Sequence, residues 1–109
     1  MEDAGEIVMT IKIIANEKGN PPGKLAEAEL HFNDGPLEGL KLIGFSVWER
    51  KSGTGRNVTF PARTYSVQGE RRSFALLRPI VDSTAQTRLR DLILEAYEEH
   101  AGAAVAATA

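Results

Sequence analysis

Apolar and polar residues alternate along the first half of the chain with the period of two that β-strands show. The first such segment, residues 6–15, places isoleucines on both of its faces. The second, residues 24–33, has one apolar and one polar face, which is typical of an antiparallel sheet with one side exposed to water. Its apolar positions are Ala26, Ala28, Leu30 and Phe32, and its polar positions are Glu27, Glu29 and His31.

The third extended segment, residues 37–50, changes phase at Gly44. Leu40 and Leu42 precede the slip in one register, and Phe45 and Val47 follow it in the other. A glycine at a phase slip predicts a bulge or bend in the strand.

Two further strands are expected in the stretch from 57 to 80. Residues 57–62 are expected to pair back as the fourth strand, residues 65–71 to connect, and residues 73–80 to form the fifth strand. Pro61 and Pro79 lack an amide hydrogen, so each predicts a strand edge, a strand end or a bulge.

The period changes to that of a helix after position 82. Ser83 and Gln86 have the spacing of a capping box, in which each side chain satisfies a free backbone amide. The apolar positions of the predicted helix are Ala85, Leu89, Leu92, Ile93, Ala96 and Tyr97. Gly102 is expected to end the helix at the latest, leaving residues 101–109 as an alanine-rich flexible tail.

These elements predict an α+β fold, in which an antiparallel sheet of about five strands is followed by one C-terminal helix. A single domain over residues 1–100 accounts for all of them. One helix covers only one face of a five-stranded sheet. We therefore expect a second copy of the chain against the sheet, or a partly closed barrel with its own interior.

The net charge of −2 conceals a strong asymmetry. Residues 1–49 carry four lysines against nine acidic residues, whereas residues 50–90 carry nine basic residues against two acidic ones. Eight of the nine are arginine, whose planar guanidinium suits phosphates and base edges. Alternatively, the arginines solubilise a hairpin and pair with acidic residues elsewhere. The nine basic residues are Arg50, Lys51, Arg56, Arg63, Arg71, Arg72, Arg78, Arg88 and Arg90.

Candidate catalytic and metal chemistry is sparse. The chain has no cysteine, which excludes disulfides and thiol catalysis and favours a cytoplasmic location. Glu27, Glu29 and His31 share a strand face and could hold a divalent metal, but a solvated strand face is the simpler interpretation. We expect no cofactor, no small-molecule substrate, no membrane span and no enzymatic activity. Trp48 and Tyr65 flank the basic segment and could stack on unpaired bases, or pack in a core or dimer interface.

Several blocks of the sequence together resemble the SpoVG family, small bacterial regulators named for effects on sporulation and septation. In order, the blocks are residues 44–47 (GFSV), 60–63 (FPAR), 71–72 (RR), 77–80 (LRPI) and 95–98 (EAYE). The chain departs from the family pattern where residues 49–58 are longer, where an Asp-Gly turn is replaced by residues 65–69, and where a histidine before Pro-Ile is missing.

This resemblance implies a homodimer with arms that reach across the twofold axis, no catalysis, and binding to DNA and RNA. The family's basic residue after Pro-Ser matches Arg63, and the arginine of its Phe-Arg-Asp block matches Arg71 or Arg72. The other basic residues enter the predicted interface by charge alone. The sequence thus predicts a nucleic-acid-binding regulator with an arginine-rich β arm. The alternative is a protein-interaction module whose basic arm meets an acidic partner.

Overall fold

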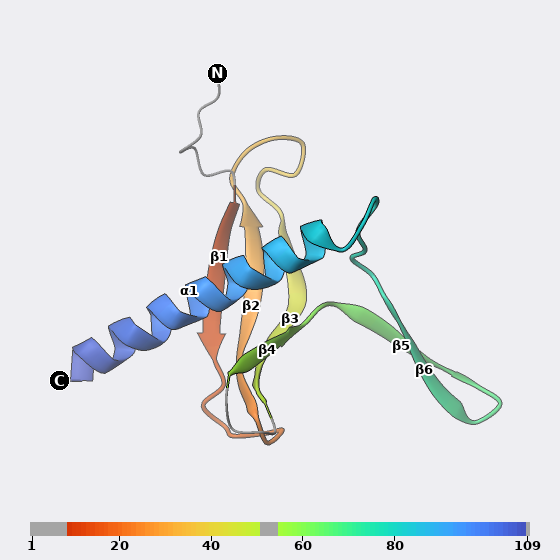
Figure 1. Cartoon of the computed structure of the whole chain (residues 1–109), viewed down its shortest axis with the longest axis horizontal. Coiled ribbons are helices and arrows are strands. Elements are labelled where there is room, and N and C mark those ends of the chain that lie inside the picture. Colours follow the sequence, from red (N-terminus) through yellow and green to blue (C-terminus); the bar gives the residue numbers. More distant parts are fainter. Residues whose placement is uncertain (1–8, 51–54, 109) are drawn as a thin grey trace.

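The computed structural model describes residues 9–50 and 55–108, with the backbone alone from residue 103 onward. Within these ranges it contains six strands in two antiparallel sheets and one long helix (Figure 1). The elements are β1 (Met9–Ala15), β2 (Lys24–Phe32), β3 (Lys41–Glu49), β4 (Arg56–Thr59), β5 (Ala62–Val67), β6 (Glu70–Ala75) and α1 (Thr84–Thr108). The predicted α+β class is confirmed. The sheet of about five strands is instead a four-stranded sheet plus a separate hairpin.

The four-stranded sheet has the order β1-β2-β3-β4, so each strand pairs with its neighbour in sequence. The register of β2 against β3 shifts between Ala28 and Leu30, and on β3 the shift falls between Leu42 and Phe45. Gly44 lies in that interval with φ +110°, which confirms the bulge predicted from the phase slip. A Cβ at Gly44 would lie only 2.8 Å from Cβ of Pro61, so the glycine also permits a close approach of the chain that leads out of the sheet.

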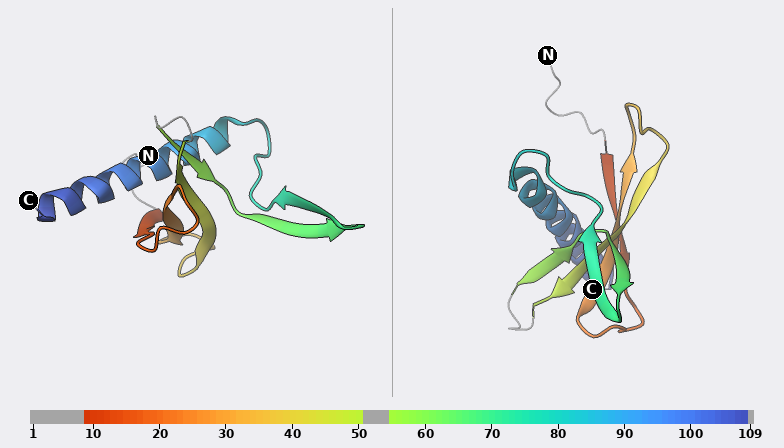
Figure 2. Two further views of the ribbon diagram at one scale, coloured as in Figure 1. Left: turned by 90° about the horizontal axis from the view of Figure 1, so that it is seen from below. Right: turned by 90° about the vertical axis from the view of Figure 1, so that its right-hand side faces the viewer.

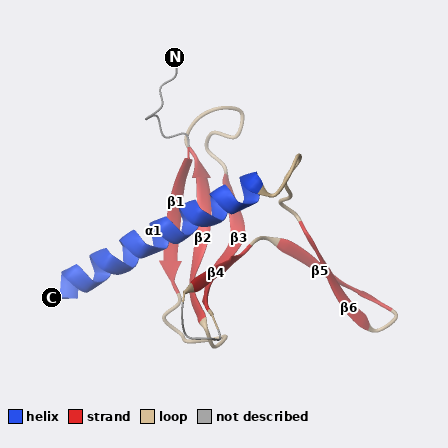
Figure 3. Ribbon diagram, in the orientation of Figure 1, coloured by secondary structure: helices blue, strands red, loops and turns tan. Residues whose placement is uncertain are grey.

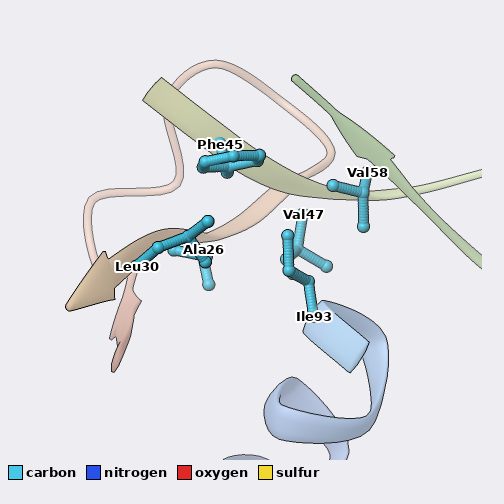
Figure 4. Close-up of a cluster of buried hydrophobic side chains, with 7 residues drawn as sticks. Ala26, Leu30, Phe45, Val47, Val58 and Ile93 are labelled. Carbon is cyan, nitrogen blue, oxygen red and sulfur yellow. The ribbon is translucent and has the colours of Figure 1, made fainter. Parts of the chain in front are cut away.

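The hydrophobic core lies between one face of this sheet and α1, which crosses it diagonally (Figures 1 and 4). The alternation in residues 24–33 is confirmed: the predicted apolar face of β2 turns inward and its polar face outward. Ile93 is the one residue of α1, among the described residues, that is fully buried against the strands, whereas Leu92 on the predicted apolar face is partly exposed. The buried residues are Ala26, Ala28, Leu30, Phe45, Val47, Val58 and Ile93.

A hairpin formed by β5 and β6, which we call the arm (residues 62–75), projects away from the sheet and the helix (Figures 1 and 2). Residues 65–71, predicted as a connection, instead form the end of β5, a two-residue turn and the start of β6. The predicted fifth strand, residues 73–80, is wrong beyond Ala75, where the chain leaves β6 and turns toward the helix (Figure 3). Pro61 and Pro79 both lie outside strands, in agreement with their missing amide hydrogens.

Both ends of α1 differ from the prediction. Asp82 is the residue whose side chain caps the helix: its Oδ1 accepts a hydrogen bond from the backbone N–H of Thr84 at 2.9 Å. This hydrogen bond is the main reason that the pKa of Asp82 is lowered. At the other end, the helix passes Gly102 and ends at Thr108, because its backbone hydrogen bonds continue through the alanine-rich segment predicted as a tail. Within the described part of the chain, no helix combines the length and apolarity needed to cross a membrane.

Candidate nucleic-acid interface

The arm is closed by a turn of two residues, Gln68 and Gly69, between the paired residues Val67 and Glu70. Both turn residues have positive φ, 55° and 82°, which matches the twist of the two strands that they join. Every residue of β5 and all of β6 except Ala75 are exposed to solvent. The arm is therefore a surface on both of its sides, and none of the described elements covers either side.

The register of the hairpin assigns the side chains of the arm to two opposite faces, since cross-strand partners share a face and neighbours along a strand do not. Arg72 pairs with Tyr65, and Arg71 pairs with Ser66. The two consecutive arginines therefore point to opposite sides. We call the side that contains Arg63, Tyr65, Val67, Glu70, Arg72 and Phe74 the aromatic face. The other side, the hydroxyl face, contains Ala62, Thr64, Ser66, Arg71, Ser73 and Ala75.

Rings and cations alternate on the aromatic face. The rings of Tyr65 and Phe74 meet edge to face with centroids 5.8 Å apart. The guanidinium of Arg78, at the root of the arm, lies over the Phe74 ring at 5.6 Å, and its Nε donates a hydrogen bond to the carbonyl oxygen of Ala75 at 2.8 Å. Arg72 forms a salt bridge of 3.1 Å with Glu70, an exposed pair of the kind that contributes little stability. This face thus combines apolar rings with positive charge.

A shallow hollow of about 230 Å³ is lined by Thr64, Arg71 and Ser73 of the hydroxyl face and by Arg72, whose position in the register belongs to the aromatic face. Hydroxyl and guanidinium groups are donors that phosphate oxygens accept from. Among the described residues, Arg71 forms no ion pair. Arg71 therefore offers its donors to an anion without a competing carboxylate among the described residues, whereas Arg72 already has Glu70 as a partner.

The nine basic residues predicted as one interface lie in separate places. Arg63, Arg71 and Arg72 are on the arm, with Arg78 at its root. The others lie on the body of the protein or outside the described residues. They are Arg50 and Arg56 at the β3–β4 connection, Arg88 and Arg90 in the first turns of α1, and Lys51, which lies outside the described residues.

On the body, Arg56 and Arg90 contact other residues of the protein. Arg56 Nη1 donates to Glu98 Oε2 at 2.8 Å, and its guanidinium lies 5.1 Å from the Tyr97 ring centroid. Arg90 lies over the Phe60 ring at 5.8 Å, and its Nε is buried without a hydrogen-bond partner. These contacts tie β4 and the segment before the arm to α1, so a role in fastening the helix accounts for both residues.

Near the root of the arm, a pocket of about 140 Å³ opens between the chain that follows β6 and the first turns of α1. Its lining residues are Phe60, Leu77, Arg78, Pro79, Ala85, Gln86 and Leu89. Close by in sequence, Ile80 and Val81 are 98% and 90% exposed. A largely apolar pocket beside two exposed aliphatic side chains is a feature that a protein partner would use.

The outer face of the four-stranded sheet carries the candidate metal residues. The Glu29 carboxylate accepts hydrogen bonds from His31 Nε2 at 2.9 Å and from Lys41 Nζ at 3.3 Å. The hydrogen bond with His31 is the largest cause of the lowered pKa of Glu29. Glu27 instead accepts a hydrogen bond from Lys24 at 2.9 Å. Over the described residues, no group of three or more His, Cys, Asp or Glu side chains is arranged to hold a metal ion. This face is a network of surface ion pairs.

Trp48 lies on the same outer face, since its neighbour Val47 is buried in the core. Its indole N–H donates to Oγ1 of Thr59 at 2.9 Å, and its ring is half-buried. Trp48 is thus held against the sheet, whereas Tyr65 is on the arm. Of the two aromatic residues considered for base stacking, Tyr65 is the one beside the arginines of the arm.

Sequence reasoning missed β5 and β6 as a pair, and with them the aromatic partner Phe74. The available signal was the pair Gln68-Gly69 between Val67 and Glu70, because a two-residue turn ending in glycine is typical of a tight hairpin. Comparison with protein-family models, with curated proteins and with solved structures finds no match. The resemblance to SpoVG therefore stays a prediction based on the sequence blocks.

Proposed function

We propose that this protein is a non-enzymatic, nucleic-acid-binding regulator of the SpoVG type, which acts as a homodimer and binds DNA or RNA through the arm. One observation carries the proposal: an arm with its arginines exposed on both sides extends from an otherwise acidic body. Phosphates of a nucleic acid fit this charge, and an extended hairpin can follow a backbone or enter a groove.

The charge distribution supports a polyanion as ligand. Arg63, Arg71 and Arg78 form no ion pairs among the described residues, and Arg72 has only the exposed Glu70. A cation without a carboxylate partner can displace counterions from phosphates, which is the main source of affinity in non-specific nucleic-acid binding. Arg56, by contrast, already has Glu98 as its partner.

The test is binding as a function of salt. We expect affinity to fall steeply as salt rises, with a log–log slope of about −0.9 per phosphate contact on duplex DNA and about −0.7 on single strands. Replacing Arg71 and Arg72 by alanine is expected to lower affinity for all sequences and to reduce the slope, while the melting temperature changes little because both side chains are exposed. Arg56→Ala is the matched control, because it removes one arginine from the body and leaves the arm intact.

Unchanged binding in the Arg71/Arg72 double variant would contradict the assignment of the arm. If wild-type protein shifts neither DNA nor RNA at low salt, the nucleic-acid proposal is wrong as a whole. A protein-interaction module is then the better interpretation, and the exposure of Ile80 and Val81 beside an apolar pocket favours it.

Formation of a dimer is a separate part of the proposal. An isolated two-stranded hairpin is marginally stable in water, and the arm has no packing layer of its own. Contact with a second copy would cover exposed apolar residues such as Leu76, Ile80 and Val81. Light scattering of the wild-type chain and of an Ile80→Ser/Val81→Ser variant measures this directly: a monomeric mass for the wild type excludes the dimer.

A further inference from the structure

We propose that the aromatic face of the arm binds unpaired bases, so that the ligand class of this protein is single-stranded nucleic acid. The inference rests on the proposed function, because it concerns the same arm. It assigns a different part of the ligand to each face: the aromatic face binds bases, and the hydroxyl face contacts phosphates alone.

The rings on this face are available to a ligand. Tyr65 and Phe74 are 41% and 39% exposed, and their edge-to-face contact fixes both rings side by side on the hairpin. Stacking on an exposed aromatic ring is the usual way in which proteins bind unpaired bases without regard to sequence, since every base has a flat π face. Tyr65 can accept a base on its ring, and Phe74 can accept a neighbouring base when the Arg78 guanidinium that lies over it moves to a phosphate.

The charges around the rings identify the occupant as a polyanion. Arg63 is the cross-strand partner of Phe74, Arg72 is the partner of Tyr65, and Arg78 lies over Phe74. An apolar protein surface placed on the rings would take Arg63 and Arg78 out of water without a counter-charge, which is costly, whereas Arg72 has Glu70 beside it. A nucleic-acid strand supplies both a flat apolar group and a negative charge, because its bases cover the rings and its phosphates pair with the arginines.

The two faces are expected to differ in how they bind a single strand and a duplex. In a duplex each base is stacked between its neighbours, so its flat face is closed to a side chain and only the phosphates and groove edges are open. The hydroxyl face, with Arg71 between serines and a threonine, has donors but no ring. It can therefore contact phosphates of either form, whereas the aromatic face gains only from unpaired bases.

The experiment compares a labelled single strand of about 12 nucleotides with the duplex of the same sequence, by fluorescence anisotropy at a series of salt concentrations that is the same for both forms. The variants are Tyr65→Leu and Phe74→Leu, singly and together, which remove the rings and retain apolar cover for the hairpin. Arg71→Ala is the matched control on the opposite face. Tyr65→Phe retains the ring and is expected to bind like the wild type.

We expect the wild type to prefer the single strand. Each leucine substitution should weaken single-strand binding by roughly 5- to 150-fold, the range of one base–aromatic stack, and leave duplex binding and the salt slope unchanged. Arg71→Ala should weaken binding to both forms alike and reduce the salt slope.

Equal losses on single strand and duplex in the leucine variants, or no loss on either, would overturn the inference while the arginine-dependent binding of the proposed function remains. A change of the oligomeric mass in the leucine variants with unchanged binding would assign the aromatic face to contact with a second copy instead. Absence of wild-type binding to both forms, in contrast, refutes the proposed function itself.

Discussion

Replacing Gly44 by alanine tests how the sheet and the arm are joined. Gly44 lies in the bulge of β3, with φ +110°, in a region that residues with a side chain rarely adopt. The new Cβ would lie 2.8 Å from Cβ and 3.3 Å from Cα of Pro61, where ordinary carbon contacts are about 3.5–4.0 Å. Pro61 is buried, and its ring cannot rotate away, so the backbone has to move.

The expected loss of stability has two parts. Backbone strain at a position of this kind costs about 1–3 kcal/mol. Overpacking against Pro61 adds about 1–3 kcal/mol, because a closely packed site accommodates an extra methyl group only by distortion. Together, about 2–6 kcal/mol would be lost, a large share of the roughly 5–15 kcal/mol that stabilises a typical domain.

Urea unfolding followed by circular dichroism measures this loss, and Gly35→Ala is the matched control. Gly35 also has a positive φ, +84°, but an added Cβ there meets no atom within 4 Å. The control therefore reports strain alone, and Gly44→Ala should exceed it by the overpacking part, about 1–3 kcal/mol. If the two variants lose equal stability, the close contact with Pro61 does not hold the root of the arm as the structure implies.

Two further predictions concern the helix. Asp82→Ala removes the acceptor for the Thr84 N–H. The pKa of Asp82 is lowered in the folded state, so the carboxylate stabilises the fold above the ordinary pKa of 3.8. This stabilisation is lost as the pH falls through the lowered pKa. The variant should thus melt below the wild type at neutral pH and approach it in acid; a difference independent of pH contradicts the cap. A double-mutant cycle on Arg56→Ala and Glu98→Ala should give a coupling below about 1 kcal/mol that shrinks with salt, because the two side chains are 38% and 63% exposed. A coupling of about 2 kcal/mol or more that does not change with salt would show that the ion pair is far better shielded from water than these exposed fractions indicate.

The elements that bury one face could be predicted from the sequence. In β2 the inward alanines and Leu30 alternate with outward charged residues, and the same alternation is visible in the bare sequence. In α1 the spacing of Leu89 and Ile93 indicates a helix that docks, and Ile93 is indeed buried. The slip at Gly44 indicated the bulge for the same reason: burial forces a period on the sequence, and a break in the period marks a break in the geometry.

The arm lacked such a signal because neither of its faces is buried. Without a core to cover, β5 and β6 need no contrast between apolar and polar positions, so residues 65–71 resembled a polar connection. The candidate site shows the same division. Its arginines and Tyr65 could be selected from residue type and charge, but the pairing of Tyr65 with Arg72 and the separation of Arg71 from Arg72 depend on the register of the hairpin.

The sequence alone thus determined the class of fold, the elements that line the core and the excess of arginine in the second half of the chain, since these depend on local periodicity and composition. Only the tertiary structure decided that four of the arginines belong to the arm and its root, while Arg56 and Arg90 contact the body. The physical reason is that strand register and long-range contacts join residues whose separation in the sequence does not determine their distance in space.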